Sequence, residues 1–228
     1  MIREFEIDNL HITCGRAEGS DKMAYILYPM DMLDSWIEPA VERYGVSIAV
    51  ITGMEWQDVL SPWPARGVPK GSPDFKGEAT AFLGRLRDKV LPQTEDFLGL
   101  GNVVERTLVG VSMSGLFALW QWMLCDTFNN IASLSGSFWY EGFVEWMKSR
   151  EIPHKAGNAF FLLGDREAFS RVKAFAGVGA STQEIIRLLG DNGIKTEFRS
   201  VPGNHYSDPL PRLNLAFDAL FSNSGFSR

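Results

Sequence analysis

Short apolar runs rich in β-branched and aromatic residues alternate along this chain with longer apolar runs of helical spacing, and this alternation constrains the fold more than any other feature. Runs of the first kind are typical of buried strands, and runs of the second kind of amphipathic helices. Alternating strands and helices connect through right-handed crossovers, which produces a mostly parallel sheet flanked by helices on both faces. The sequence therefore predicts an α/β fold.

The predicted elements run along the whole chain. The first two dozen residues predict an antiparallel hairpin at one edge of the sheet. The expected strands are 23–30, 46–53, 106–113, 130–138 (a strand running into a loop), 159–164 and 195–201. The expected helices are 35–45, 78–99 (with a possible break at Pro92), 115–126, 143–151, 182–193 and 211–221. Residues 54–77 are rich in Pro, Gly and Trp, which predicts an ordered irregular loop near a functional site.

Composition bounds the remaining possibilities. The 228 residues, without repeats or linkers, predict one domain over 1–228 with no separate lid domain. A net charge of −6 argues against a nucleic-acid partner. The charged first residues do not resemble a signal peptide, and no apolar stretch approaches the roughly 18 residues that cross a bilayer. Cys14 and Cys125 lack metal-ligand spacing and predict free thiols in a cytoplasmic protein.

Serine chemistry is indicated by "TLVGVSMSGLF", residues 107–117, where a strand-like run meets a helix-like run at Ser112. A nucleophile on such a turn follows the pattern G-x-S-x-G. Here Ser114 occupies the last position of the pattern and the glycine follows at Gly115. Ser112 is therefore either a catalytic nucleophile or a small residue in a crowded turn.

The base and the acid are sought at the carboxyl ends of the strands, where function collects in such sheets. His205 follows the last predicted strand, whereas His11 lies in the hairpin and His154 at the opposite end of the sheet. Two carboxylates, Asp165 and Glu167, follow strand 159–164. We favour Glu167 because its position leaves room for the chain to turn toward the histidine. A role for Asp165, or a dyad without an acid, stays open, and Asp208 is interpreted as a local loop cap.

Backbone amides can stabilise the oxyanion that forms when a serine attacks an ester. Met113, the residue after the nucleophile, is one expected donor. The second is Met30, because Pro29 has no N–H.

Aromatic residues near the predicted site are candidates for binding substrate. Trp139 and Tyr140 follow a strand end, where they either line a substrate pocket or pack under the loop. Trp120 and Trp122, on the helix behind Ser112, are predicted to lie in the core. The chain has no glycine-rich phosphate loop and no metal-ligand pattern, so we expect neither a cofactor nor a metal.

Six segments resemble, in order, signature segments of the esterase family of α/β hydrolases that includes the siderophore (enterochelin) esterases and the S-formylglutathione hydrolases. They are "AYILYPMD", "DVLSPWPA", "GVSMSGLFALW", "SLSGSFWY", "LLGDREA" and "PGNHYSD". The resemblance implies an α/β-hydrolase fold and ester hydrolysis through an acyl-enzyme. It also implies Ser112 as nucleophile, His205 as base, and Met30 and Met113 as oxyanion donors.

The sequence thus predicts a serine esterase that acts on a small-molecule ester, with Ser112, His205 and Glu167 as its catalytic residues. An acyltransferase or a carbohydrate-ester hydrolase using the same site is the nearest alternative. A non-catalytic binding protein with the same fold is the alternative from another class. The oligomeric state is not predicted.

Overall fold

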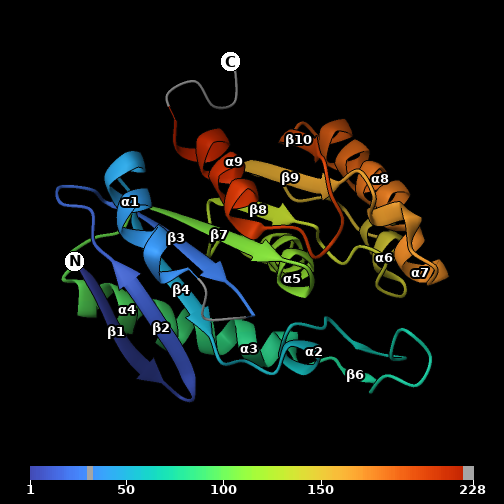
Figure 1. The fold of residues 1–228 in the computed structure, drawn as a ribbon, viewed down its shortest axis with the longest axis horizontal. Helices are drawn as coiled ribbons and strands as arrows, with labels where there is room; N and C mark the ends of the chain where they lie inside the picture. Colours follow the sequence, from blue (N-terminus) through green and yellow to red (C-terminus); the bar gives the residue numbers. More distant parts are fainter. Residues whose placement is uncertain (30–32, 223–228) are drawn as a thin grey trace.

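An eight-stranded sheet forms the centre of the molecule (Figure 1). The structure is a computed structural model that describes residues 1–29 and 33–222. In spatial order the strands are β1 (Ile2–Ile7), β2 (Leu10–Gly15), β4 (Ser47–Thr52), β3 (Lys22–Leu27), β7 (Glu105–Val111), β8 (Asn130–Leu134), β9 (Asn158–Gly164) and β10 (Lys195–Val201). The order places the N-terminal hairpin at one edge and β10 at the other.

The strand directions confirm the predicted fold class. From β4 to β10 all neighbouring strands are parallel, whereas β1 pairs antiparallel with β2 and β2 antiparallel with β4. Asp8 and Asn9 join β1 to β2 with φ angles of 47° and 65°. Positive φ at both central residues is typical of the tight turn that matches the twist of a hairpin. The expected edge hairpin is therefore present.

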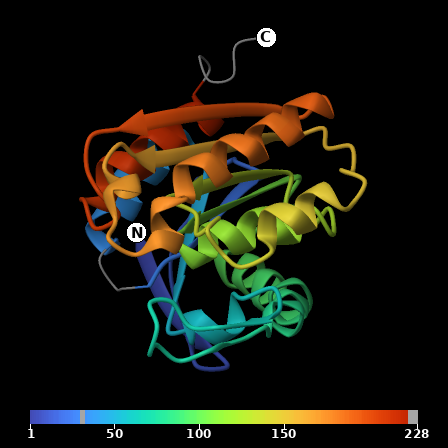
Figure 2. The ribbon, with the colours of Figure 1, turned by 90° about the vertical axis from the view of Figure 1, so that its right-hand side faces the viewer.

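Helices cover both faces of this sheet, as expected (Figures 1 and 2). One face packs against α1 (Asp34–Tyr44) and α9 (Pro209–Phe221). The helices on the other face are α3 (Ala79–Arg85), η1 (Leu86–Val90), α4 (Leu91–Leu98), α5 (Met113–Trp122), α6 (Phe143–Lys148) and α8 (Val178–Asp191). Two short segments, η2 (Glu167–Phe169) and α7 (Lys173–Ala176), lie between β9 and α8. None of the helices in the described ranges is long and apolar enough to span a bilayer.

Two expectations about irregular segments are wrong. Pro92 does not break the helical stretch, which continues from α3 through the π-helical η1 into α4. Pro92 is the second residue of α4 and directly follows the π-helical turn and Leu91. The segment 54–77 is not wholly irregular, because it contains α2 (Trp56–Val59) and a strand pair formed by β5 (Pro64–Ala65) and β6 (Phe75–Lys76).

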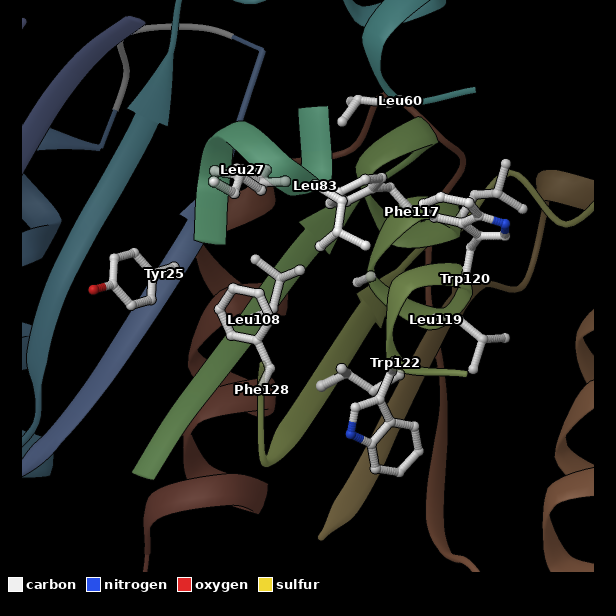
Figure 3. Close-up of a cluster of buried hydrophobic side chains, with 14 of the residues drawn as sticks. Tyr25, Leu27, Leu60, Leu83, Leu108, Phe117, Leu119, Trp120, Trp122 and Phe128 are labelled. Atoms are coloured by element: carbon white, nitrogen blue, oxygen red, sulfur yellow. The ribbon is translucent and has the colours of Figure 1, made fainter. Parts of the chain in front are cut away.

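Helix α5 lies deep in the core, with all of its residues buried. Figure 3 shows Phe117, Trp120 and Trp122 of this helix in the same buried cluster as Leu108 of β7 and Phe128. Trp120 and Trp122 are 4% and 0% exposed, so their predicted place in the core is confirmed. A helix buried on every side has to approach its strand closely, which restricts the residues at the turn between them.

Gly110 of β7 is the position where this approach is closest. A Cβ atom at Gly110 would lie 2.1 Å from the backbone oxygen of Ser114 in α5. That separation is far shorter than any non-bonded contact, and the obstacle is backbone that cannot rotate away. Glycine is therefore required here by packing.

Gly110→Ala is expected to lower the free energy of unfolding by about 3 kcal/mol or more, because α5 has to move away from β7. Gly84→Ala is the matched control, since a Cβ at this helical position meets open space. It should be neutral or stabilising by about 1 kcal/mol. Urea denaturation followed by tryptophan fluorescence measures both. Equal stability of the two variants would contradict the packing argument.

Candidate active site

Ser112 occupies the turn between β7 and α5 in a strained backbone conformation. Its φ and ψ angles are 59° and −119°. For a residue with a Cβ atom, such a conformation costs on the order of 1–3 kcal/mol. Hydrogen bonds hold the turn on both sides, because Ser112 N donates to Leu134 O at 3.0 Å and Ser112 O accepts from Ser137 N at 3.0 Å. The turn has the strand–Ser–helix context of a nucleophile elbow.

Ser114, which replaces the expected glycine of the motif, has a structural use of its own. Its hydroxyl is fully buried and donates to Leu27 O at 2.8 Å, at the end of β3. The same oxygen accepts from Val111 N at 2.7 Å, at the end of β7. Ser114 therefore joins the ends of two neighbouring strands beside Ser112, a role that a glycine could not fill.

His205 reaches Ser112 from the loop that follows β10. Its Nε2 atom lies 3.0 Å from Ser112 Oγ, within hydrogen-bond distance. The imidazole side chain is 32% exposed, so substrate and water can reach it. Of the other histidines, His11 belongs to β2, and His154 precedes β9. The structure therefore brings together the predicted nucleophile and the predicted base.

Glu167 lies behind the imidazole of His205. Its Oε2 atom is 3.0 Å from His205 Nδ1, and its side chain is only 3% exposed. The other oxygen, Oε1, accepts hydrogen bonds from Ser135 Oγ at 2.6 Å and from Gly164 N at 2.8 Å. Burial raises the pKa of Glu167, but the hydrogen bonds from His205, Ser135 and Gly164 outweigh it, and the net pKa is lowered. The group next to His205 is thus held as a carboxylate.

The two other carboxylates considered from the sequence lie outside this chain of hydrogen bonds. Asp165 is half-exposed, and its Oδ1 accepts from Gly203 N at 2.9 Å, which ties the loop after β9 to the loop after β10. Asp208 caps α9, because its side chain accepts from Leu210 N at 3.0 Å. The interpretation of Asp208 as a local cap is confirmed.

Arg212 is one of the residues near the site that the sequence did not reveal, together with Ser135 and Ser137. It belongs to α9, and its side chain is 7% exposed. Its guanidinium donates to Ser135 Oγ at 2.7 Å and lies 3.3 Å from Glu167 Oε1. Arginines are common on helices, and nothing in the local pattern around "PLPRLNL" marks this one as buried.

A cavity of about 650 Å³ opens beside Ser112 and His205. Half of its aromatic and aliphatic lining residues come from the segment between β9 and α8, and Trp139 of the β8 loop also lines it. The aromatic and aliphatic lining residues are Trp139, Phe169, Val172, Phe175, Val178 and Tyr206. Phe169 and Tyr206 are 79% and 90% exposed, so large apolar surfaces border the opening.

The prediction that Tyr140 binds substrate together with Trp139 needs correction. Tyr140 is 2% exposed and is not among the described residues that line the cavity. Its hydroxyl donates to Trp63 O at 2.5 Å, and its ring contacts the rings of Trp63 and Phe75. Tyr140 therefore packs under the loop 54–77, because a buried phenol needs a hydrogen-bond acceptor and the loop supplies one.

The two expected oxyanion donors differ in what the structure describes. Met113 is the first residue of α5, directly after Ser112, and is buried. The first N–H groups of a helix have no partner within the helix, so the Met113 amide is suited to an incoming oxyanion. Met30 lies outside the described residues.

Within the part of the chain that is described, no group of three or more His, Cys, Asp or Glu side chains could hold a metal ion.

No protein-family model matches this chain. It is similar to YbbA of Bacillus subtilis (strain 168), an uncharacterized protein, with 23% identity over 162 residues that cover 69% of this chain and 65% of YbbA. Siderophore hydrolase EstB from Aspergillus nidulans is 17% identical with a TM-score of 0.77, covering 100% of this chain and 97% of EstB. The chain has the fold of the siderophore esterases.

A second solved structure has the same fold. Enterobactin hydrolase IroE, in complex with DFP, is 18% identical with a TM-score of 0.72, and the superposition covers 95% of this chain and 92% of IroE. The predicted resemblance to siderophore esterases is thus confirmed at the level of the fold.

The lowered pKa of Glu167 predicts how this residue affects stability in acid. Between its ordinary value of 4.5 and the lower folded-state value, the unfolded chain binds more protons. The stabilisation is therefore complete above pH 4.5 and is lost as the pH falls through the folded-state value. In Glu167→Gln, the free energy of unfolding should decrease less steeply with falling pH than in the wild type.

Urea denaturation at a series of pH values from 6 to 3 (about the range over which carboxylates titrate) measures these slopes. Glu151→Gln, at an exposed position, is the control and should keep the wild-type slope. A slope for Glu167→Gln equal to that of the wild type would contradict the assignment.

Proposed function

We propose that this protein hydrolyses carboxylic esters through an acyl-enzyme on Ser112. The observation that supports this most is the chain of two 3.0 Å contacts from Ser112 Oγ through His205 to Glu167. A serine, an imidazole and a buried carboxylate in this order are the parts that acyl transfer requires. They come from three separate loops at the carboxyl ends of β7, β9 and β10.

The proposed reaction has two stages. In the first, His205 Nε2 takes the proton of Ser112 Oγ while this oxygen attacks the ester carbonyl, and the imidazolium then protonates the departing alcohol. In the second, His205 takes a proton from water, whose oxygen attacks the acyl carbon, and Ser112 regains its proton as the carboxylic acid leaves. Glu167 stabilises the imidazolium in both stages.

Backbone amides are proposed to stabilise the oxyanion in both stages. The amide of Met113 is one donor, and the amide of Met30 is the second. Such donors act on charge that develops only in the transition state, which is why they accelerate the reaction rather than tighten substrate binding.

The cavity indicates the kind of ester. Its aromatic and aliphatic walls favour a substrate with an apolar acyl or alcohol group, which Trp139 is proposed to contact. The structural neighbours include the siderophore hydrolase EstB and the enterobactin hydrolase IroE. We propose ester hydrolysis for this chain as well, without assigning a particular siderophore as its substrate. Rates for p-nitrophenyl esters of increasing acyl length measure this preference on the acyl side, and rates for acetate esters of increasing alcohol length measure it on the alcohol side. A preference for the shortest group in both series would contradict it.

Ser112→Ala is expected to lower kcat for p-nitrophenyl esters by about a thousandfold or more, because it removes the oxygen that is proposed to form the acyl-enzyme. A fluorophosphonate should label wild-type Ser112 covalently and leave Ser112→Ala unlabelled, as intact-protein mass spectrometry would show. The exposed Ser149→Ala is the control and should behave as the wild type. An unlabelled wild type would instead favour a binding protein of the same fold.

Glu167→Gln should lower kcat by on the order of a hundredfold to ten-thousandfold, because an amide cannot stabilise the imidazolium as a carboxylate does. Asp165→Asn changes a neighbouring acid in the same way and should have little effect on kcat. Steady-state kinetics of the two variants decide between the acids. If Asp165→Asn were the more impaired variant, the assignment of Glu167 would be wrong.

A further inference from the structure

A buried guanidinium connects the loop of the acid with the loop of the base. Arg212 Nη1 donates to Ser135 Oγ at 2.7 Å and lies 3.3 Å from Glu167 Oε1. Its other terminal nitrogen, Nη2, donates to Asn204 O at 2.7 Å. Asn204 is the residue immediately before His205. One rigid side chain therefore contacts the acid and the backbone next to the base.

Gly164, the last residue of β9, leaves space for this guanidinium, whereas a side chain at Gly203 would only be in ordinary contact with it. A Cβ atom at Gly164 would lie 3.0 Å from Arg212 Nη2 and 3.0 Å from Glu167 Oε1. A Cβ atom at Gly203 would lie 3.5 Å from the same nitrogen. The loop after β9 and the loop after β10 thus close around Arg212 from two sides.

The chemistry of arginine suits this position better than that of lysine. The guanidinium is planar and donates in fixed directions, so its two terminal nitrogens can serve two partners at once. A lysine ammonium carries the same charge as a single point. Burying a charge is costly unless it is paired and hydrogen-bonded, and here Glu167 and Ser135 provide both.

We propose that Arg212 is a positioning residue that fixes Glu167 and His205 relative to each other. This inference rests on the proposed function, since it concerns the same catalytic residues. Arg212 and Ser135 occupy Glu167 Oε1, which leaves Oε2 to face His205 Nδ1. The hydrogen bond to Asn204 O fixes the backbone of the loop that carries His205, so that His205 Nδ1 stays 3.0 Å from Glu167 Oε2. Arg212 is not among the described residues that line the cavity, so it acts through its neighbours rather than on the substrate.

The test uses Arg212→Lys, because this substitution retains the positive charge beside the buried carboxylate of Glu167. Because lysine offers one nitrogen in place of the two that contact Glu167 and Asn204, kcat should fall about tenfold or more while KM stays unchanged. The rate of fluorophosphonate labelling of Ser112 should fall in parallel. Arg43→Lys is the matched control. Arg43 of α1 donates, at an exposed position, to Asp218 of α9, which is the helix that contains Arg212. Arg43→Lys should keep wild-type kcat.

A spectroscopic readout separates positioning from a general loss of structure. An imidazole N–H bonded to a carboxylate gives a proton resonance far downfield of the amides, and wild type should show it for His205 Nδ1. It should be absent in Glu167→Gln and broadened or lost in Arg212→Lys, with the dispersion of the amide spectrum unchanged. Ser135→Ala, which removes the shared hydroxyl, should weaken the resonance as well.

The outcomes distinguish this inference from the proposed function. If Arg212→Lys keeps both the wild-type kcat and the downfield resonance while the wild type is active, the positioning role is wrong and the esterase proposal stands. If Arg212→Lys unfolds, Arg212→Gln decides instead, and wild-type kcat in that folded variant overturns the positioning role. A wild type that neither turns over esters nor reacts with the fluorophosphonate would overturn the proposed function itself.

Discussion

The close packing of α5 against β7 is the constraint on which the rest of this structure depends. Because α5 is buried on every side, the chain must turn sharply at Ser112, and Gly110 must lack a side chain. The turn leaves Ser112 at a positive φ, with its Oγ facing His205. The strain of this conformation is offset by the burial of a helix rich in aromatic and aliphatic residues. The packing of α5 against β7 therefore also determines the orientation of the candidate nucleophile.

A second constraint is the burial of charge beside the site. Glu167 is almost fully enclosed, so its carboxylate needs donors at both oxygens. His205 faces one oxygen, and Ser135, Gly164 and Arg212 surround the other. A network in which every polar group has its hydrogen-bond partners is rigid. If one donor were missing, a buried carboxylate oxygen would have no partner in apolar surroundings. This is why the acid can be close to the imidazole without being accessible to water.

The sequence predicted the parts of this structure that depend on local pattern. The alternation of apolar runs was sufficient for the sheet, the hairpin and the placement of Ser112, Glu167 and His205 at one sheet edge. It could not decide the role of Tyr140, because a tyrosine after a strand end looks the same whether its hydroxyl faces a cavity or a loop carbonyl. It also missed the partners of Ser114 and Arg212, since those hydrogen bonds join residues that are far apart in the chain. Pro92 was misjudged because a π-helical turn before it has no sequence signature that we could use.

The N-terminal hairpin and the loops of the candidate active site lie on different halves of the sheet, with β1 at one edge and β10 at the other. The candidate site belongs to the part of the chain that begins with β7. Its residues are Ser112, Glu167, His205 and Arg212. Substitutions in the hairpin therefore reach these residues only through the intervening strands. A change in the length or surface charge of that edge would therefore leave the contacts among these four residues in place.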